Sequence, residues 1–508
     1  MVFGAIIKQG LRLGTKVKLR TISPARQQAR ELRRLLSKAR DTSFGRQYGF
    51  DRILSSSDMT ATFQESVPFH NYNSMHDGWW NRCLQEEENV CWPGYVKYFA
   101  LSSGTSESAS KHIPVTRDMI KSLKKASIRQ IVTLGKYDLP AEFFEKGILW
   151  LGGSTDLQKQ GGYYEGDVSG ISARRVPIWF QRYYKPGKKL RKEKDWNQKL
   201  EEITRQAKDW DIGIITGVPS WVQLLFEKII DRYGVKSIHE IWPNLRIYLH
   251  GGVSFEPYRR AFDRFFTNKV HYIEVYPASE GFIAFQSEPD VHHMKMILNN
   301  GIFYEFVPFD EKHFDGNGEI RTDAVALTID QVKTGTDYAI LLSTCAGAWR
   351  YLIGDTIRFT DVEKAKIVIT GRTKHFLSLV GEHLSVDNMN RAVDRLSDEF
   401  GVELSEFCVA GVPSEGSFAH HWYIGINHNT VPDKTALSKR LDEILKELND
   451  DYAVERGSAL KDPQLDIVPV ERFYAFMTTK GKMGGQNKFP RVMKATQFEE
   501  WKSFQSQG

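Results

Sequence analysis

The sequence predicts an α/β protein with a large N-terminal domain, mixed and mostly parallel sheets, and a small C-terminal α+β lid domain. Short apolar runs typical of buried strands alternate with stretches of helical period, which favours parallel sheets. At 508 residues the chain is too long for a single ordinary core. The pattern changes near residue 371, so we predict domains at residues 1–371 and 372–508.

In the large domain, the first expected helix runs from Ser23 to about Lys38, with Ser23 as the N-cap and Pro24 at the first helical position. Strands are expected at residues 95–101, 148–151, 212–215, 245–249, 270–276, 338–342 and 367–370. Further helices are expected at residues 116–134, 219–233 and 257–266. Residues 300–345 are rich in strand patterns and poor in helix signals, which predicts an antiparallel sub-region there.

The C-terminal part has a different order of elements. Helices are expected at residues 386–400 and 432–450, and strands at 405–412, 420–426 and 465–470. Two helices over a few antiparallel strands make a small α+β module. Thr478–Arg491 is rich in Gly and Lys and is interpreted as a mobile loop.

Composition narrows the class of protein. The four cysteines are scattered without a C-x-x-C pair, which favours a reducing compartment, and we predict a cytoplasmic protein. The net charge of +6 permits anionic substrates and does not require nucleic acid. No apolar run reaches the roughly 18 residues of a membrane span, so no stable membrane anchor is expected. The oligomeric state cannot be read from the sequence.

The first twenty residues interleave apolar side chains with Lys8, Arg12, Lys16, Lys18 and Arg20, and no acidic residue precedes Glu31. Three interpretations stay open: an amphipathic helix docked on the domain, a weak contact with a membrane surface, or an organellar transit peptide. The docked helix is the interpretation that we favour.

Several common motifs are absent from the sequence. There is no G-x-x-x-x-G-K-[ST], no G-x-G-x-x-G after a strand and no G-x-S-x-G elbow. The pairs His292-His293 and His420-His421 are adjacent, so their side chains diverge and do not suit a metal site. These absences exclude the most frequent nucleotide-binding and hydrolase classes.

A run of small hydroxyl residues follows the expected strand at 95–101 and ends at Lys111. Gly104 allows the backbone to approach a ligand closely, and Ser and Thr hydroxyls with backbone N–H groups can surround phosphate oxygens. The Lys111 ammonium can neutralise a leaving pyrophosphate. A polar linker has the same composition, although a long linker is unusual between a strand and a helix of one compact domain.

This run, SSGTSESASK, resembles the phosphate-loop motif SSGTSxGxxK of the GH3 acyl acid amido synthetases, which belong to the acyl-adenylate-forming superfamily. Further motifs of that family follow in the same order, over about residues 95–491. The resemblance implies catalytic roles for Lys111, Glu280 and Lys488. It also implies nucleotide contacts for Ser102, Ser103, Gly104, Thr105, Ser106, Gly252, Tyr276, Ala278, Ser279, Asp355 and Arg372.

Tyr276-Pro277-Ala278-Ser279-Glu280 matches the family's Y-x-[AS]-S-E, which implies that Glu280 helps to hold Mg²⁺. Trp349–Asp355 resembles Y-R-x-G-D, and Asp355 is expected to accept hydrogen bonds from the ribose hydroxyls. The motif's arginine is replaced by Leu352. We therefore consider Arg350, two residues earlier, as a substitute, because alternate residues of a strand share a face.

Residues 370–382 look like the superfamily's hinge motif, which implies that Arg372 contacts ribose or phosphate. The hinge aspartate of the superfamily is Lys374 here, so the hinge residue stays open. Gly381 would let its loop enter the site closely. Lys488 lies in the Gly-rich terminal loop and resembles the family's C-terminal catalytic lysine, and Gly252 resembles a turn beside the nucleotide.

The expected function is the ATP-dependent conversion of a small carboxylic acid to its acyl-AMP, with release of pyrophosphate. Mg²⁺ is the expected cofactor, and an amino-acid amine is the expected acceptor of the acyl group in a second step. Two alternatives stay open: an acyl-CoA ligase with the same first step, and a non-catalytic protein that binds the nucleotide or acyl-AMP.

Overall fold

The computed structural model describes residues 2–16, 22–102, 111–173, 178–252, 255, 258–310, 312–315, 318–373, 376–377, 379–380, 382, 384–402, 404–426, 432–480, 489–493 and 495–506. Within these residues the chain forms two compact units, one built from residues up to 373 and the other from residues after 373. None of the helices in the described part of the chain has the length and apolar character needed to cross a membrane.

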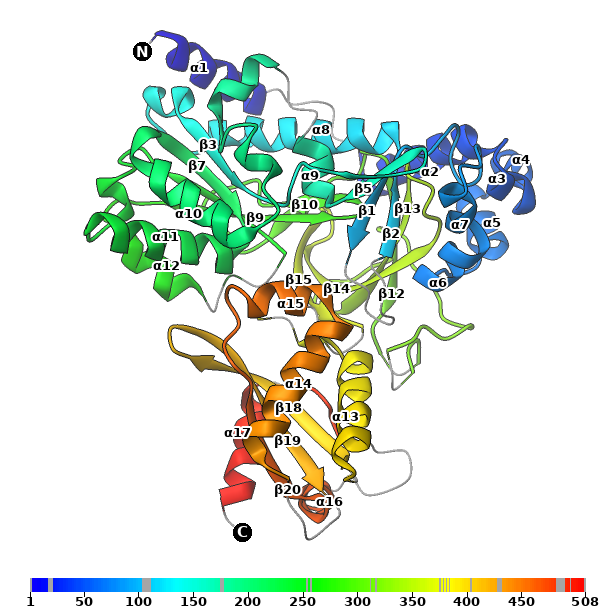
Figure 1. Ribbon diagram of the computed structural model, residues 1–508. Helices are drawn as coiled ribbons and strands as arrows, with labels where there is room; N and C mark the ends of the chain where they lie inside the picture. The colour runs from blue at the N-terminus through cyan, green and yellow to red at the C-terminus, as the bar shows by residue number, and fades with distance from the viewer. Residues whose placement is uncertain are drawn as a thin grey trace. The chain divides into compact units, whose positions relative to one another are not determined.

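The first unit is built on a mixed sheet, which has eleven strands among the described residues (Figure 1). Its parallel half contains β6 (Tyr184–Lys185), β3 (Gly147–Leu151), β7 (Ile212–Gly217), β8 (Ile247–His250) and β9 (His271–Ala278), in that order. The antiparallel half continues with β10 (Gly281–Phe285), β11 (Met294–Met296), β15 (Lys366–Arg372), β14 (Tyr351–Asp361), β13 (Asp337–Thr344) and β12 (Ile302–Pro308).

A second, four-stranded sheet lies in the same unit. It contains β2 (Lys111–Val115), β1 (Tyr98–Ser102), β5 (Tyr163–Gly166) and β4 (Gln158–Gln160), in that order. β1 and β2 form an antiparallel hairpin, and β5 pairs with β1 in parallel. The run of small hydroxyl residues is therefore the connection of a hairpin.

Helices cover the parallel half because its strands need crossover connections. The crossover helices are α10 (Trp196–Gln206), α11 (Pro219–Tyr233) and α12 (Arg259–Phe265), whereas α8 (Arg117–Thr133) contacts β10 and α9 (Val168–Ala173) contacts β1. Thr116 caps α8 by accepting the N–H of Met119, and Pro219 opens α11 at its first turn.

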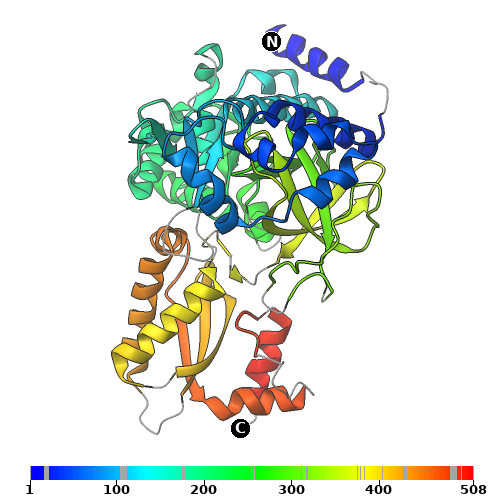
Figure 2. The same cartoon turned by 90° about the vertical axis from the view of Figure 1, so that its right-hand side faces the viewer.

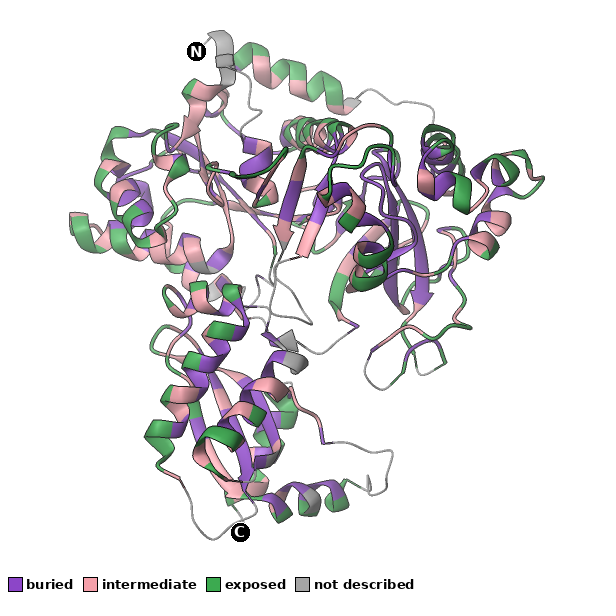
Figure 3. Ribbon diagram, turned by 45° about the vertical axis from the view of Figure 1, so that its right-hand side comes forward, coloured by how far each residue is buried: buried purple, intermediate pink, exposed green. Residues whose placement is uncertain are grey.

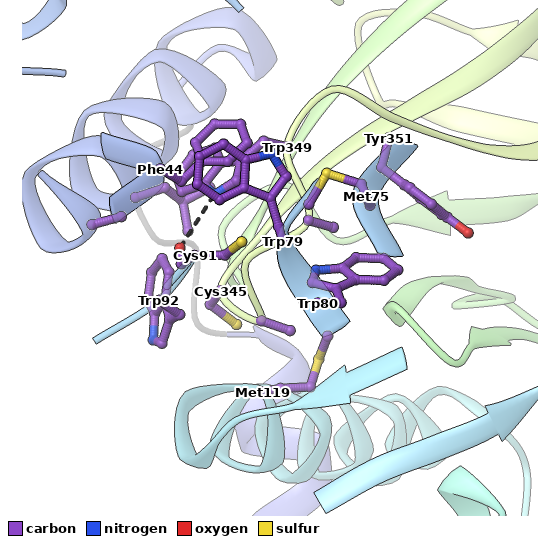
Figure 4. Packing of buried hydrophobic residues seen from close by; sticks show 14 of the residues in the cluster. Phe44, Met75, Trp79, Trp80, Cys91, Trp92, Met119, Cys345, Trp349 and Tyr351 are labelled. Carbon is purple, nitrogen blue, oxygen red and sulfur yellow. Dashed lines mark hydrogen bonds between the residues drawn. The ribbon is translucent and has the colours of Figure 1, made fainter. Parts of the chain in front are cut away.

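Short N-terminal helices cover the other half of the sheet (Figure 2). They are α2 (Pro24–Ala39), α3 (Ser43–Gln47), α4 (Phe50–Ser55), α5 (Met59–Ser66), α6 (Tyr72–Met75) and α7 (Asn81–Leu84), with a π-helical turn at His76–Trp80. Ser23 caps α2 as predicted, and α2 packs on β12 and β13. Under these helices lies an aromatic core that contains Phe44, Trp80 and Trp349 (Figure 4).

The N-terminal segment forms α1 (Val2–Lys16), which docks on the turns at residues 134–136 and 141–145 and on the end of α8. The backbone N–H of Gly4 donates to Glu145 Oε1 at 2.7 Å. The docked helix, which was the favoured interpretation of this segment, is therefore confirmed.

The second unit is a small α+β module. Its three-stranded sheet has the order β18 (Leu404–Ser414), β19 (Ser417–Ile426) and β20 (Gln464–Pro469), and a short pair joins β16 (Phe376–Leu377) to β17 (Leu384–Ser385). The helices are α13 (Val386–Phe400), α14 (Lys434–Leu448), α15 (Asp450–Arg456), α16 (Val470–Thr479) and α17 (Ala495–Ser506). α14 buries Leu437, Leu441 and Leu445 and exposes its opposite side (Figure 3).

The predicted mixed α/β class is confirmed, and the antiparallel sub-region at 300–345 appears as β12 and β13. Antiparallel pairing extends further than predicted. In the spatial order β9, β10, β11, β15, β14, β13 and β12, each strand pairs antiparallel with the next. The expectation of mostly parallel sheets therefore needs correction for this half. The sequence of β14 lacks the uninterrupted apolar run on which that expectation rested.

Candidate functional site

Three hairpins or strand pairs carry the residues that the sequence singled out. Ser102 and Lys111 face each other as the last pair of the β1–β2 hairpin, so the loop between them is closed at its base. The loop residues Ser103, Gly104, Thr105 and Ser106 lie outside the described residues. Lys111 is the first residue of β2, so its backbone position is held by the hairpin.

The second group comes from the tight hairpin between β9 and β10. Ala278 pairs with Gly281, so Ser279 and Glu280 form its two-residue turn. Two residues before this pair, Tyr276 is buried in β9. A turn this short leaves the Glu280 carboxylate little freedom, because both flanking residues are held in the strand ladder.

The third group comes from β14 and β15, where Asp355 and Arg372 are directly opposite each other. Arg372 Nε lies 3.1 Å from Asp355 Oδ1, and the Tyr276 hydroxyl donates to Asp355 Oδ2 at 2.6 Å. The Asp355 side chain is 20% exposed and that of Arg372 is 30% exposed. The carboxylate therefore keeps an open side, and each of its oxygens retains a further lone pair.

Electrostatic coupling joins these groups in one cluster. Burial raises the pKa of Glu280, and the negative charge of Asp355 adds to this rise. The N–H of its own backbone, Lys111 and Arg372 act in the opposite direction. Lys111, Asp355 and Arg372 therefore lie close enough to Glu280 to affect its titration.

Two buried tyrosines tie the carboxylates to the fold. Burial, with the neighbouring Asp355 charge, raises the pKa of Tyr276 well above its ordinary value. Burial, with the charge of Glu280 and a hydrogen bond to it, raises the pKa of Tyr351 in the same way. Both hydroxyls stay protonated at neutral pH, so each can donate to its carboxylate.

Sequence reasoning missed the aromatic residues behind the cluster. Lys111 Nζ lies 5.4 Å from the centroid of the Tyr72 ring, and the Tyr72 hydroxyl accepts the N–H of His112 at 3.0 Å. The ring of Trp80 is 6.0 Å from Tyr72 and 5.4 Å from Tyr351 (Figure 4). Tyr72 lies in a four-residue helix far from Lys111 in sequence, so no local pattern signals its position.

The hypothesis that Arg350 replaces the motif arginine at Leu352 is wrong. The Arg350 side chain is 5% exposed, pairs with Glu305 at 3.1 Å and donates to the carbonyls of Gln64 and Val67 at 2.7 Å. Arg350 precedes β14 and has φ +41°, so the alternation of a strand does not extend to it. Its guanidinium group holds the α5 region against the sheet.

Gly251 and Gly252 follow β8, beside the end of β9. A Cβ atom on Gly251 would lie 2.2 Å from the Val275 carbonyl oxygen, and Gly252 has φ +86°. His250 is the last residue of β8 that pairs with β9, opposite Glu274, so this turn begins beside the end of β9. The turn thus needs both glycines in order to pass close to β9.

Four further residues that the sequence singled out lie outside the described residues. These are Lys488, Lys374, His375 and Gly381. In the same loop, Glu382 is fully buried and accepts the N–H of Leu379 and a hydrogen bond from His420 at 2.9 Å. In the described part of the chain, no group of three or more His, Cys, Asp or Glu side chains is arranged to hold a metal ion.

Comparison with solved structures supports the fold. The GH3.15 acyl acid amido synthetase has a TM-score of 0.59 and 16% sequence identity, with 99% of this chain and 96% of that chain covered. A 2-hydroxyisobutyryl-CoA ligase in complex with 2-HIB-AMP and CoA has a TM-score of 0.58 and 11% identity, covering 95% and 92%. The chain therefore has the fold of these two proteins.

Among named relatives, the indole-3-acetic acid-amido synthetase GH3.4 of Arabidopsis thaliana is 24% identical over 44% of this chain and 39% of its own length. The jasmonoyl–L-amino acid synthetase GH3.5 of Oryza sativa subsp. japonica is 29% identical over 28% of this chain and 26% of its own length. The aligned part thus spans less than half of either relative.

Family profiles cover most of the chain. The GH3 family N-terminal domain matches residues 15–207 and 159–271, the GH3 family central domain matches residues 295–372, and the GH3 family C-terminal domain matches residues 387–497. The chain belongs to the GH3 family.

Proposed function

We propose that this chain is an AMP-forming acid–amino acid ligase, which activates a small carboxylic acid with ATP and transfers the acyl group to an amine. The observation that carries the proposal is the cluster of Lys111, Glu280, Asp355 and Arg372 at the ends of separate strand pairs. Two cations and two carboxylates around one space suit a nucleotide with its ribose and phosphates. The names of the relatives agree with this activity.

In the first step, Asp355 accepts hydrogen bonds from the ribose hydroxyls on its open side. Arg372 and the Tyr276 hydroxyl hold the carboxylate in place for this role. The acid attacks the α-phosphate in line, and Lys111 with the hydroxyl-rich loop stabilises the charge on the departing pyrophosphate. Ala278 and Ser279 supply backbone groups along the nucleotide, and Gly252 leaves room beside Tyr276.

Glu280 fits the role of a Mg²⁺ ligand. Mg²⁺ prefers hard oxygens and is usually bound by one or two carboxylates together with phosphates and water. Burial raises the pKa of Glu280 and the charge of Asp355 adds to the rise, so a bound cation near Glu280 would favour its ionised form. When bound, Mg²⁺ would neutralise charge on the phosphates.

We propose that the residues after 371 form a small mobile domain, which takes part in adenylation through Lys488 and allows the second step by its rotation. Lys488 would neutralise the carboxylate and α-phosphate during adenylation, and rotation about the segment near Lys374 would then admit the amine. We place the enzyme in the cytoplasm. The four cysteines are free and buried thiols, which agrees with a reducing compartment.

A CoA ligase is the second candidate, because the TM-score with an acyl-CoA ligase is similar to the TM-score with the amido synthetase. The two activities have the same first step and differ in the acceptor. A third alternative is a protein that binds the nucleotide or acyl-AMP without catalysis.

The test is a pyrophosphate-exchange assay with a panel of carboxylic acids, followed by mass spectrometry of products formed with pooled amino acids or with CoA. Acid-dependent exchange and an amide product are expected. Glu280→Gln and Lys488→Ala should each lower exchange at least about 100-fold, as loss of one electrostatic group does in other enzymes. The control Glu363→Gln changes an exposed carboxylate and should have no effect.

Each outcome decides between the candidates. A thioester without an amide would make the chain a CoA ligase. Nucleotide binding without exchange for any acid would leave a binding protein. If Glu280→Gln catalyses pyrophosphate exchange as fast as the parent, the cluster does not take part in catalysis and the proposed site is wrong.

A further inference from the structure

Helix α1 has two different faces. Gly4, Ile7 and Leu11 recur at helical spacing on the side that docks, and the backbone of Leu11 approaches Gly135 so closely that a Cβ atom there would lie 2.7 Å from it. A Cβ atom on Gly4 would meet the Ala141 carbonyl oxygen at 2.2 Å. Close backbone approach at both ends fixes this side of α1 on the first unit.

The opposite face of α1 points to solvent and is apolar at two positions. Ile6 is 61% exposed and Leu13 is 59% exposed. They are seven residues apart and therefore lie on one side of the helix, about 140° on average from the docked residues. Gln9 and Gly10 are exposed between them, so this stripe carries no charge.

Helix α8 extends this apolar surface. Its buried side contains Met119, Ser122 and Ala126, whereas Ile128 is 52% exposed and Ile131 is 40% exposed. The ends of the two helices touch, because a Cβ atom on Gly14 would lie 3.2 Å from Val132 Cγ1. Figures 1 and 2 show α1 and α8 along the same edge of the first unit.

The α1–α8 surface is unusual for this protein. Among the described residues, eight large apolar side chains are strongly exposed, and four of them are Ile6, Leu13, Ile128 and Ile131. Single exposed apolar side chains are ordinary, but a concentration on two adjacent helices indicates an interaction surface.

Helices α1 and α8 carry an excess of positive charge, which favours a negatively charged partner. Their sequences contain eight basic residues and one acidic residue, Asp118. Asp118 is paired with Lys38 and Lys121, so it adds little free negative charge to the surface. The basic residues are Lys8, Arg12, Lys16, Arg117, Lys121, Lys124, Lys125 and Arg129.

We propose that the α1–α8 surface binds the headgroup region of an anionic lipid bilayer, with Ile6, Leu13, Ile128 and Ile131 inserted to the level of the acyl chains. Apolar side chains flanked by Lys and Arg are the pattern of helices that lie in a membrane interface. The flanking cations are attracted to the negative surface potential of anionic lipids. This inference is independent of the proposed ligase activity.

The test is co-sedimentation of the full-length chain with vesicles of phosphatidylcholine, with and without phosphatidylserine. Binding is expected with phosphatidylserine vesicles and should weaken as salt is added. Ile6→Glu with Leu13→Glu, and separately Ile128→Glu with Ile131→Glu, should each lower affinity at least about tenfold. Lys121→Ala and Lys124→Ala should each lower it about fivefold.

Val325→Glu is the matched control, because Val325 is 53% exposed and lies on neither helix. Its binding should equal that of the unchanged protein, and circular dichroism should show that every variant is folded. The proposal is overturned if phosphatidylserine vesicles sediment no more protein than phosphatidylcholine vesicles. It is also overturned if both double variants bind normally, or if light scattering shows that the surface joins two copies of the chain.

Discussion

At the residue scale, the candidate site depends on how two carboxylates are held. Asp355 is oriented from two sides, by Arg372 from the neighbouring strand and by Tyr276 from β9. Glu280 is oriented by its two-residue turn and by the Tyr351 hydroxyl. Each acidic group thus has a supporting tyrosine that is buried while the carboxylate keeps access to the ligand space.

Tyr276→Phe removes the hydroxyl that positions Asp355 and leaves the ring in the core. A hydrogen bond to a charged group contributes about 1.5–3 kcal/mol, so the KM for ATP should rise about tenfold or more. Tyr272→Phe in the same strand removes a comparable bond, from Tyr272 to Asp263 at 2.7 Å, and is the matched control. Equal KM values for the two variants would contradict a positioning role for Tyr276.

Glu280→Gln should stabilise the fold while it abolishes adenylation. The pKa of Glu280 is raised in the folded protein, so the folded state loses stability as pH rises from the ordinary value for Glu through the raised one. At neutral pH the amide removes this cost, and the Tm should rise. Below the ordinary pKa of Glu the difference should vanish. Thermal melts at pH 4 and pH 8 check this, with Glu363→Gln as the control; a Tm that falls at pH 8 would contradict it.

At the scale of elements, the sequence locates long periodic helices well. The helices at 219–233 and 386–400 are found at the predicted residues. The helices α3 to α7 are four to eight residues long, so they show too few turns for a period to be recognised. β14 was missed because Gly354, Asp355 and Thr356 interrupt its apolar pattern, and this is where the strand carries the site.

The turn after β8 gives a prediction at this scale. Gly251→Ala places a methyl group against the Val275 carbonyl, so β8 and β9 must separate, and stability should fall by more than about 1 kcal/mol. Nucleotide affinity should fall as well, because Tyr276 is the next residue of β9. Gly187→Ala adds a methyl group in open space and should stay within about 0.5 kcal/mol of the parent in urea unfolding. Equal stabilities for the two variants would disprove the contact.

At the scale of the whole molecule, the site is assembled from distant parts of the chain. The motifs could be located in the sequence because they follow or interrupt strand patterns, and the roles of their residues stay a prediction. The aromatic support could not, because Tyr72 and Trp80 reach Lys111 and Tyr351 only through tertiary packing. The hypothesis about Arg350 was wrong for the same reason, because its ion-pair partner Glu305 lies on β12 and meets it only through tertiary packing.

His70 links global stability to pH. Burial lowers the pKa of His70 to about 4. The hydrogen bond between His70 Nδ1 and the Trp349 carbonyl, at 2.9 Å, acts in the opposite direction and only partly offsets this shift. The unfolded chain takes up a proton near the ordinary pKa of 6.5 and the folded chain does not, so stability falls as pH drops from 6.5 to about 4. The expected loss is about 3 kcal/mol.

Urea unfolding at pH 7.5 and pH 5 measures this effect. In His70→Asn the pH dependence should become flatter, even though the variant is less stable at both values. His292→Asn alters an exposed histidine and should leave the slope unchanged. The same slope in His70→Asn and in the parent would assign the effect to other groups.

The last residues before the boundary between the two units are anchored in the site itself. Arg372 contacts Asp355, and the next N–H, of Thr373, donates to the Gly354 carbonyl at 2.7 Å. If the proposed function is right, a ribose bound on the open side of Asp355 would share this carboxylate with Arg372, which lies on the strand that leads out of the first unit. Occupancy of the nucleotide position would then change the contacts of Arg372 and Thr373, which are the last residues of the first unit.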